Sequence, residues 1–225
     1  LRQFDPDCLR QINSKILNNI AQIFDCEVEE ITNIKKIKEG MNNNSFAFNI
    51  GDQRYVYRHP GRNTDYINRV SECFSMNVAK ELGLDKTFIE MSAHEGWKLS
   101  YFISDVETLN YRNKEQVSTA LSMLRKLHQA KVHSEFDFDV WGKIRKFKEK
   151  LLLTSKADYP EFAQLSAQME TLRQHMERDS SESVLCHCDS YAPNFMVHHG
   201  EMELIDWGYS GNCDPAFDLG VFICC

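Results

Sequence analysis

Hydrophobic residues along the first hundred positions recur with periods that change from helical to extended. Apolar side chains spaced three or four residues apart predict a first helix that ends near Asp25. From 46 to 50 apolar and polar residues alternate, Gly51-Asp52 supplies turn chemistry, and the alternation resumes over 54–58. This second segment predicts a β-hairpin. The periodic residues of the first helix are Leu9, Ile12, Ile16, Ile20 and Ile23.

A second helical pattern covers 65–82, where five apolar residues fall on one stripe that we expect to face the core. Short strands are predicted after it, at 87–91 and 98–103. The order of helix, hairpin, helix and two strands is typical of a small sheet-based unit. The residues of the stripe are Ile67, Val70, Phe74, Val78 and Leu82.

After Asp105 the pattern becomes mainly helical. Three segments carry helical periodicity, and a short β segment over 195–205 interrupts them; the helical segments are 115–130, 140–153 and 159–176. We therefore predict an α+β, two-lobed fold, with a small antiparallel-sheet N-lobe over 1–104 and a mainly helical C-lobe over 105–225. The cleft between the lobes is the expected ligand site.

Composition and charge limit the kinds of partner and the cellular location that we expect for this chain. The chain has 225 residues and a formal net charge of −7, which argues against a nucleic-acid partner because such proteins present a broad basic surface. It has no long apolar run and no secretory pattern in its first 24 residues, so we expect no membrane insertion and a cytoplasmic location. The eight cysteines are scattered, which favours reduced thiols over disulfides.

The strongest chemical signal is the spacing His187-x-Asp189-x-x-x-x-Asn194, followed twelve residues later by Asp206 after an apolar strand. Phosphoryl transfer needs a carboxylate that orients the attacking hydroxyl and hard oxygen ligands that hold Mg²⁺. Asp189 is therefore the candidate catalytic base, and Asn194 and Asp206 are the candidate metal ligands. A loop that satisfies its own backbone would not require the full spacing.

The first half of the chain supplies a candidate ATP site. In the return strand of the hairpin, period two places Val56 and Arg58 on one face, as an adenine contact and a phosphate-binding cation require. Glu72 is the candidate partner of Arg58, although its helical position lies away from the apolar stripe and also fits a glutamate that faces solvent. The turn before the hairpin is the candidate phosphate loop, with Gly40, Asn42, Asn43, Asn44 and Ser45.

These motifs together resemble the choline kinase and aminoglycoside phosphotransferase superfamily, and most of all its bacterial choline kinase branch. The resemblance implies a kinase-like bilobal fold, ATP and Mg²⁺ as cosubstrates, and the roles given above for Asp189, Asn194, Asp206 and Arg58. It also implies that Tyr101-Phe102-Ile103 is the hinge that offers backbone groups to adenine. The resembling stretches occur in family order, at 40–46, 55–61, 67–72, 124–128, 187–194, 205–207 and 214–219.

The acceptor implied by the resemblance is a small-molecule alcohol, with choline as the first expectation. A quaternary ammonium is held by aromatic faces and carboxylates, and the candidates are Asp189, Tyr191, Trp207 and Tyr209; Trp207 fits core packing equally well. Gly208 departs from the choline kinase pattern, which carries an acidic residue there, so an aminoglycoside or another small alcohol stays open. Because the family continues with further helices, we expect part of the acceptor pocket beyond Cys225.

Two other functional classes, a zinc hydrolase and a pseudokinase, match parts of the sequence. A zinc hydrolase could use Cys186, His187 and Cys188, but the chain has no Cys-x-x-Cys pair, and cysteines on both sides of His187 would point away from it in extended backbone. Buried thiols are the preferred interpretation. A non-catalytic pseudokinase, which would only bind a nucleotide or another ligand, would be expected to lack the catalytic base, a metal ligand or the strand cation. All four of these residues are present: Asp189, Asn194, Asp206 and Arg58. His128 is expected to anchor the end of its helix to a neighbouring loop, without a chemical role.

Overall fold

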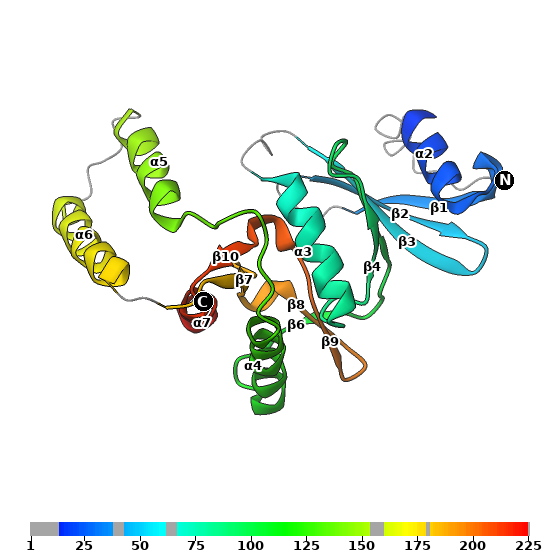
Figure 1. Cartoon of the computed structure of the whole chain (residues 1–225). Helices are drawn as coiled ribbons and strands as arrows, with labels where there is room; N and C mark the ends of the chain where they lie inside the picture. Colours follow the sequence, from blue (N-terminus) through cyan, green and yellow to red (C-terminus); the bar gives the residue numbers. More distant parts are fainter. Residues whose placement is uncertain (1–13, 38–42, 62–66, 154–159, 179–180, 225) are drawn as a thin grey trace.

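The computed structural model describes residues 14–37, 43–61, 67–153, 160–178 and 181–224. An antiparallel five-stranded sheet dominates the first half of the chain, with strand order β1-β2-β3-β5-β4 (Figure 1). Both strands predicted at 87–91 and 98–103 are present in it. The strands are β1 (Ile31–Ile37), β2 (Asn43–Ile50), β3 (Gln53–Pro60), β4 (Phe88–Met91) and β5 (Lys98–Tyr101).

The predicted hairpin is confirmed by an unbroken register between β2 and β3, which places Ser45 opposite Arg58. Gly51 turns the chain with a φ of +57°, a conformation that glycine adopts without steric cost. One face of the sheet buries Phe46 and Phe48 against the helix α2 (Ser14–Phe24). The one-turn helix η1 (Val28–Glu30) lies between α2 and β1 in the chain. Leu9 and Ile12 of the predicted first helix lie outside the described residues.

The helix predicted at 65–82 is present as α3 (Arg69–Glu81), but its predicted buried stripe is wrong at Val70 and Phe74, while Val78 and Leu82 are partly buried against the main core. Val70 and Phe74 are 55% and 38% exposed, whereas Glu72 is completely buried. α3 instead turns Glu72 toward Arg58 on the sheet, and the same face of the helix buries Met76 and Ala79 completely. The buried residues of α3 are Ser71, Glu72, Ser75, Met76 and Ala79.

The second half is mainly helical, as predicted, with a small sheet of order β6-β8-β9 and a pair of strands β7 and β10. The three predicted helices are confirmed, and in Figure 1 α5 and α6 lie apart from the large sheet. The helices are α4 (Lys114–Gln129), α5 (Val140–Leu153), α6 (Phe162–Arg178) and α7 (Pro215–Cys224). The strands are β6 (Glu107–Thr108), β7 (Val184–Cys186), β8 (Phe195–His198), β9 (Glu201–Leu204) and β10 (Gly211–Cys213), and the short helices are η2 (Ala192–Asn194) and η3 (Trp207–Tyr209).

The main hydrophobic core joins the two halves. It runs from Met76 on α3 through Phe88 on β4 to Leu124 on α4 and Trp207 on η3. Burial of this apolar surface fixes α3 and the large sheet against the segments that carry the catalytic spacing. A lobe boundary near 104 stays a prediction. Within the described residues, no helix combines the length and the apolar character needed to span a membrane.

Candidate active site

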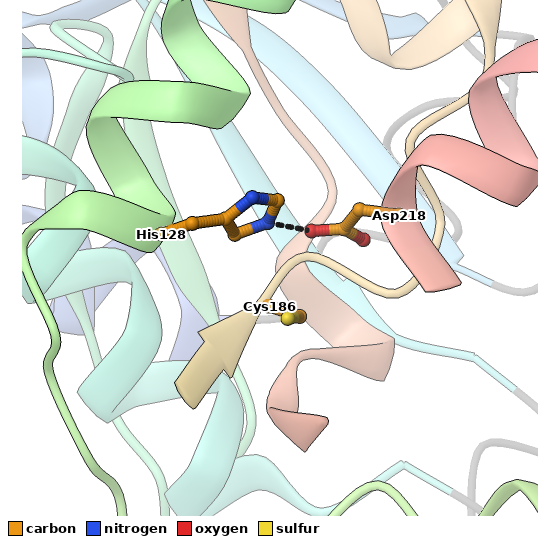
Figure 2. Close-up of side chains that lie close together, drawn as sticks. All are labelled: His128, Cys186 and Asp218. Atoms are coloured by element: carbon orange, nitrogen blue, oxygen red, sulfur yellow. Dashed lines mark hydrogen bonds and ion pairs between the residues drawn. The ribbon is translucent and has the colours of Figure 1, made fainter. Parts of the chain in front are cut away.

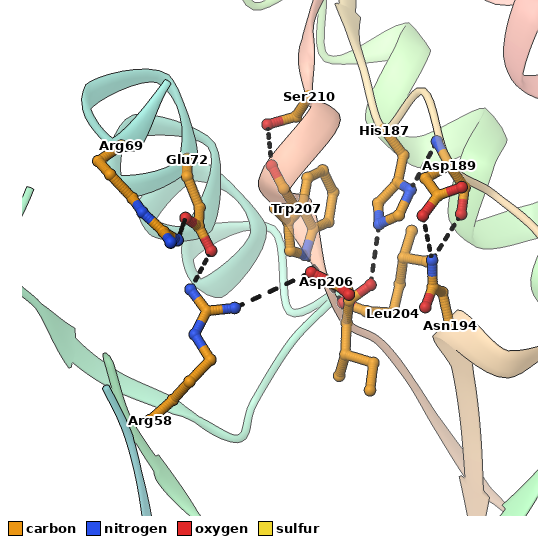
Figure 3. A network of polar contacts seen from close by, with 11 residues as sticks. Arg58, Arg69, Glu72, His187, Asp189, Asn194, Leu204, Asp206, Trp207 and Ser210 are labelled. Carbon is orange, nitrogen blue, oxygen red and sulfur yellow. Dashed lines mark hydrogen bonds and ion pairs between the residues drawn. The ribbon is translucent and has the colours of Figure 1, made fainter. Parts of the chain in front are cut away.

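The loop 187–194 begins after β7 and ends in η2, and it presents Asp189 beside Asn194 (Figure 3). The amide nitrogen of Asn194 donates to the backbone oxygen of Asp189 at 2.7 Å and to its carboxylate at 3.0 Å. Asn194 is buried, so this pair fixes the orientation of the carboxylate and leaves the amide oxygen of Asn194 for a cation. Burial raises the pKa of Asp189, against the opposing effects of His187 and Asn194, which suits a general base.

His187 links this loop to the segment that precedes Asp206. Its Nδ1 accepts from the backbone N–H of Asp189 at 3.2 Å, so Nε2 carries the proton and donates to the carbonyl of Ile205 at 2.9 Å. The ring is fully buried and meets Trp207 edge-on, with centroids 4.7 Å apart. His187 therefore positions the backbone on both sides of the site and has no surface for a ligand.

Asp218 on α7 is a functional residue that the sequence analysis did not identify. Its buried carboxylate accepts from the backbone N–H groups of His187 at 3.0 Å and Cys188 at 2.7 Å, and pairs with Nε2 of His128 at 2.8 Å (Figure 2). One carboxylate thus holds the start of the catalytic loop, and His128 anchors the end of α4 as predicted, although its partner lies on α7 and not in a neighbouring loop. The signal was an aspartate inside the otherwise apolar helix α7.

Cys186 lies close to His128 and Asp218, and such a trio has the residue types of a metal site (Figure 2). Its thiol donates instead to the carbonyl of Cys213 at 3.4 Å, and burial raises the pKa of Cys186, which disfavours the thiolate that binds metals. Asp218 already accepts three hydrogen bonds. These contacts agree with the predicted role of Cys186 as a small buried thiol.

Arg58 and Glu72 meet on the other side of the site, as predicted (Figure 3). Nη2 of Arg58 donates to Oε1 of Glu72, and Nη1 lies 3.9 Å from the Oδ1 atom of Asp206. Although burial raises the pKa of Glu72, the charges of Arg58, Lys98 and Arg69 hold it below its usual value. Glu72 is therefore an ionised carboxylate that holds the guanidinium of Arg58 next to Asp206, a candidate metal ligand.

Asp206 follows β9 with a left-handed backbone, at a φ of +65°, and its side chain is 57% exposed. This conformation is uncommon for a residue other than glycine and aims the carboxylate out of the strand. The backbone N–H of Ile205 donates to the carbonyl of Asn194 at 2.9 Å, which holds the two candidate ligands at the same end of β8 and β9. Their amide and carboxylate oxygens are of the type that Mg²⁺ prefers, so the residues fit this ion.

Lys98 is a second cation that the sequence analysis did not assign. The register of β3 and β5 places it directly opposite Arg58, and directly opposed residues of an antiparallel pair share a face of the sheet. Burial lowers the pKa of Lys98, and the charge of Arg58 lowers it further, while Asp85, Glu72 and Asp206 oppose the change. Alternation of Lys98 and Ser100 in β5 was the available signal.

The predicted nucleotide-binding segments are partly described. Gly40 and Asn42 lie outside the described residues, while Asn43, Asn44 and Ser45 open β2 beside the end of β3. Val56 is half-buried, opposite Ser100 in the register of β3 and β5. In the hinge, the backbone N–H groups of Tyr101 and Phe102 already donate to Thr87 at 2.8 Å and Arg54 at 3.0 Å. These two N–H groups are therefore already used within the fold, and Ile103, the third predicted hinge residue, is half-buried.

The predicted acceptor residues separate into two groups. Trp207 is completely buried, and its Nε1 donates to the carbonyl of Leu204 at 2.9 Å, so its expected contact with the acceptor is corrected to a core role. The indole instead supports η3 behind Asp206. Tyr191 is the cap residue before η2 and is half-buried. The ring of Tyr209 faces Lys143, whose Nζ lies 5.1 Å from the ring centroid.

Comparisons with known proteins agree with this geometry. The model of the choline/ethanolamine kinase family matches residues 34–225. Protein LicA of Haemophilus influenzae is 26% identical over 190 residues, which cover 82% of this chain and 56% of LicA. The chain thus spans little more than half the length of that relative.

Solved structures share the fold. Choline kinase LicA from Streptococcus pneumoniae matches with a TM-score of 0.75 at 21% identity, over 93% of this chain and 73% of that one. A spectinomycin phosphotransferase in complex with ADP and spectinomycin matches with a TM-score of 0.62 at 17% identity, over 92% of this chain and 72% of that one. The kinase-like α+β fold predicted from the sequence is confirmed by these likenesses.

Proposed function

This chain belongs to the choline/ethanolamine kinase family, and on that basis we propose that it is an ATP- and Mg²⁺-dependent phosphotransferase that converts choline to phosphocholine in the cytoplasm. The observation that carries the proposal is the meeting of two separate groups at one site. Asp189 and Asn194 come from the catalytic loop, while Arg58 and Glu72 come from β3 and α3, and Asp206 lies between them. A kinase needs these groups together.

In this proposal Asp189 acts as the base. The acceptor hydroxyl attacks the γ-phosphorus, a new O–P bond forms as the bond to the ADP oxygen breaks, and the hydroxyl proton passes to the Asp189 carboxylate. The hydrogen bond from Asn194 keeps one carboxylate oxygen in place while the other receives the hydroxyl. Catalysis here consists mostly of positioning and charge stabilisation.

Asn194 and Asp206 would hold Mg²⁺, which when bound neutralises charge on the triphosphate. The guanidinium of Arg58 would bind the phosphates, because Glu72 fixes one of its nitrogens and leaves the other facing Asp206. Ser45 lies opposite Arg58 at the phosphate loop. The carbonyls of the hinge and Val56 would contact adenine.

The acceptor would lie against the exposed side of Asp189, with Tyr191 and Tyr209 as the remaining aromatic candidates for a quaternary ammonium. A different small alcohol, such as an aminoglycoside, is the second candidate because of Gly208. A Cβ placed on Gly208 would lie 3.7 Å from Oδ1 of Asp206, an ordinary van der Waals distance, so there is room for the first atom of a side chain where this chain carries none. An ADP-bound aminoglycoside phosphotransferase shares this fold with a TM-score of 0.57 at 18% identity, which supports this second candidate.

A coupled ADP-release assay tests both candidates, with choline, ethanolamine, an aminoglycoside and methylthioribose as acceptors, each with and without Mg²⁺. We expect the highest kcat/KM with choline and no turnover without Mg²⁺. Activity confined to the aminoglycoside would favour the second candidate. If the chain neither releases ADP with any acceptor nor binds ATP, the proposed kinase activity is wrong.

A further inference from the structure

The two oxygens of Glu72 bind two different arginines (Figure 3). Oε1 accepts from Arg58 on β3, and Oε2 accepts from Nη1 of Arg69 at 2.6 Å. Glu72 is completely buried and the Arg69 side chain is 13% exposed, so the three residues form one buried unit. The proposed binding of phosphate by Arg58 gives a reason for the contact between Glu72 and Arg58. It gives no reason for the contact between Glu72 and Arg69.

Arg69 stands at a position that costs stability. It is the first residue of α3, directly after the cap residue Asn68, where the helix dipole disfavours a cation. The order of a cation followed three residues later by an acid is also the weaker orientation of such a pair. In addition, Nη2 of Arg69 is buried without a hydrogen-bond partner among the described residues. Helix stability therefore does not explain this arginine.

Neighbouring residues pack closely around the Arg69 side chain. Gly96, in the turn between β4 and β5, has a φ of +76°, and a Cβ there would lie 3.4 Å from Nε of Arg69 and 2.7 Å from Cγ of Pro60. Any larger residue would push on both neighbours. The side chain of Asn68 accepts from the backbone N–H groups of Val70 and Ser71, which fixes the first turn of α3. These contacts fix the direction of the Arg69 side chain toward Glu72.

We propose that Arg69 is a positioning residue for phosphoryl transfer, which occupies Oε2 of Glu72 so that Arg58 is held by Oε1 alone. Without Arg69, Glu72 offers both oxygens to Arg58, and the guanidinium forms the two-bond pair that arginine and carboxylate prefer. Nη1 of Arg58 then turns from Asp206 toward Glu72. The inference rests on the proposed function, since it concerns how Arg58 is presented to the nucleotide.

Arg69→Met and Arg69→Lys, each alone and combined with Glu72→Gln, test the proposal by steady-state kinetics and by calorimetric binding of ATP. We expect Arg69→Met to lower kcat/KM for ATP about tenfold and to weaken ATP binding by a similar factor. Arg69→Lys keeps one charged donor and should stay within about threefold of the wild type. In the Glu72→Gln background, Arg69→Met should change activity less than about twofold, because the contact is already lost.

Arg125→Met, on the exposed face of α4, is the matched control and should leave both measurements unchanged. If Arg69→Met fails to fold by circular dichroism, Arg69→Leu, which also lacks a donor, takes its place with the same expectation. A lower melting temperature with unchanged kinetics and ATP binding would overturn the proposal in favour of a structural role, as would equal losses with and without Glu72→Gln. If the wild type binds ATP but transfers no phosphate, the proposed function fails, while weaker ATP binding by Arg69→Met still supports the positioning role.

Discussion

The two sides of the candidate site are held together by different forces. On the catalytic-loop side, a single buried carboxylate, Asp218, accepts backbone N–H groups, and Asn194 orients Asp189 with a neutral amide. On the β3–α3 side, Glu72 is surrounded by cations from three elements. The catalytic-loop side therefore depends on satisfied hydrogen bonds, whereas the β3–α3 side depends on a balance of buried charges that a change in protonation can alter.

The largest effect is expected from the catalytic-loop side, in Asp189→Asn. The amide cannot accept the hydroxyl proton, so turnover should fall about 10³-fold while ATP affinity stays within about twofold of the wild type. ADP release and calorimetry measure the two quantities. Asp52→Asn, in the hairpin turn far along the chain from the loop, is the control. Undiminished turnover in Asp189→Asn would contradict the proposed role of Asp189 as the base and the assignment of the loop as catalytic.

Asp218→Asn tests whether one carboxylate holds the loop. The amide has one accepting oxygen in place of two, so at least one buried N–H loses its partner, and the free energy of unfolding should fall by about 2–4 kcal/mol. Urea denaturation measures the loss. Glu149→Gln, on the exposed face of α5, makes the same chemical change and should alter stability by less than about 0.5 kcal/mol. Equal stability of the two variants would contradict the role of Asp218.

Lys98→Met tests the charge balance on the β3–α3 side. Burial and Arg58 lower the pKa of Lys98 in the folded state, so its protonated form costs stability at neutral pH. This cost disappears as the pH rises through the folded pKa toward about 10.4, the pKa of an unfolded lysine. Lys98→Met should therefore stabilise the fold by about 1 kcal/mol at pH 7, and the gain should shrink as the pH approaches 10.

Urea denaturation at several pH values measures this dependence, with Lys150→Met on exposed α5 as the matched control. A gain of equal size at every pH would indicate better packing by methionine and not a relieved charge. A loss of stability at pH 7 would mean that attraction to Glu72 and Asp206 outweighs burial and the charge of Arg58.

The same contrast explains what the sequence could predict. Periodic elements depend on local pattern, so α5 (Val140–Leu153) was predicted with its observed bounds, and the spacing of the catalytic loop identified Asp189 and Asn194. The partners of buried charges depend on segments far apart in the chain. Asp218 lies 31 residues from His187, and its contact arises from the packing of α7, which no local period encodes.

The face of α3 is the clearest example of this limit. Apolar periodicity favoured the stripe with Val70 and Phe74, but tertiary contact reversed the choice, because Glu72 pairs with Arg58 and Met76 enters the core on the same face. Hydrophobic periodicity weighs only the transfer of apolar surface from water. It does not include the cost of leaving a cation on the neighbouring strand without its carboxylate.

The smallest effect should therefore come from the residue that periodicity placed in the core. Val70 is 55% exposed, so Val70→Ala removes little buried surface and improves helix propensity, and the free energy of unfolding should change by less than about 0.5 kcal/mol. Met76→Ala, six residues later on the buried face, should cost about 2–4 kcal/mol because it leaves a cavity in the main core. Urea denaturation of both variants decides between the faces. A reversed order would restore the stripe predicted from the sequence and place Glu72 outside the buried charge balance, because α3 cannot bury both faces against the same sheet.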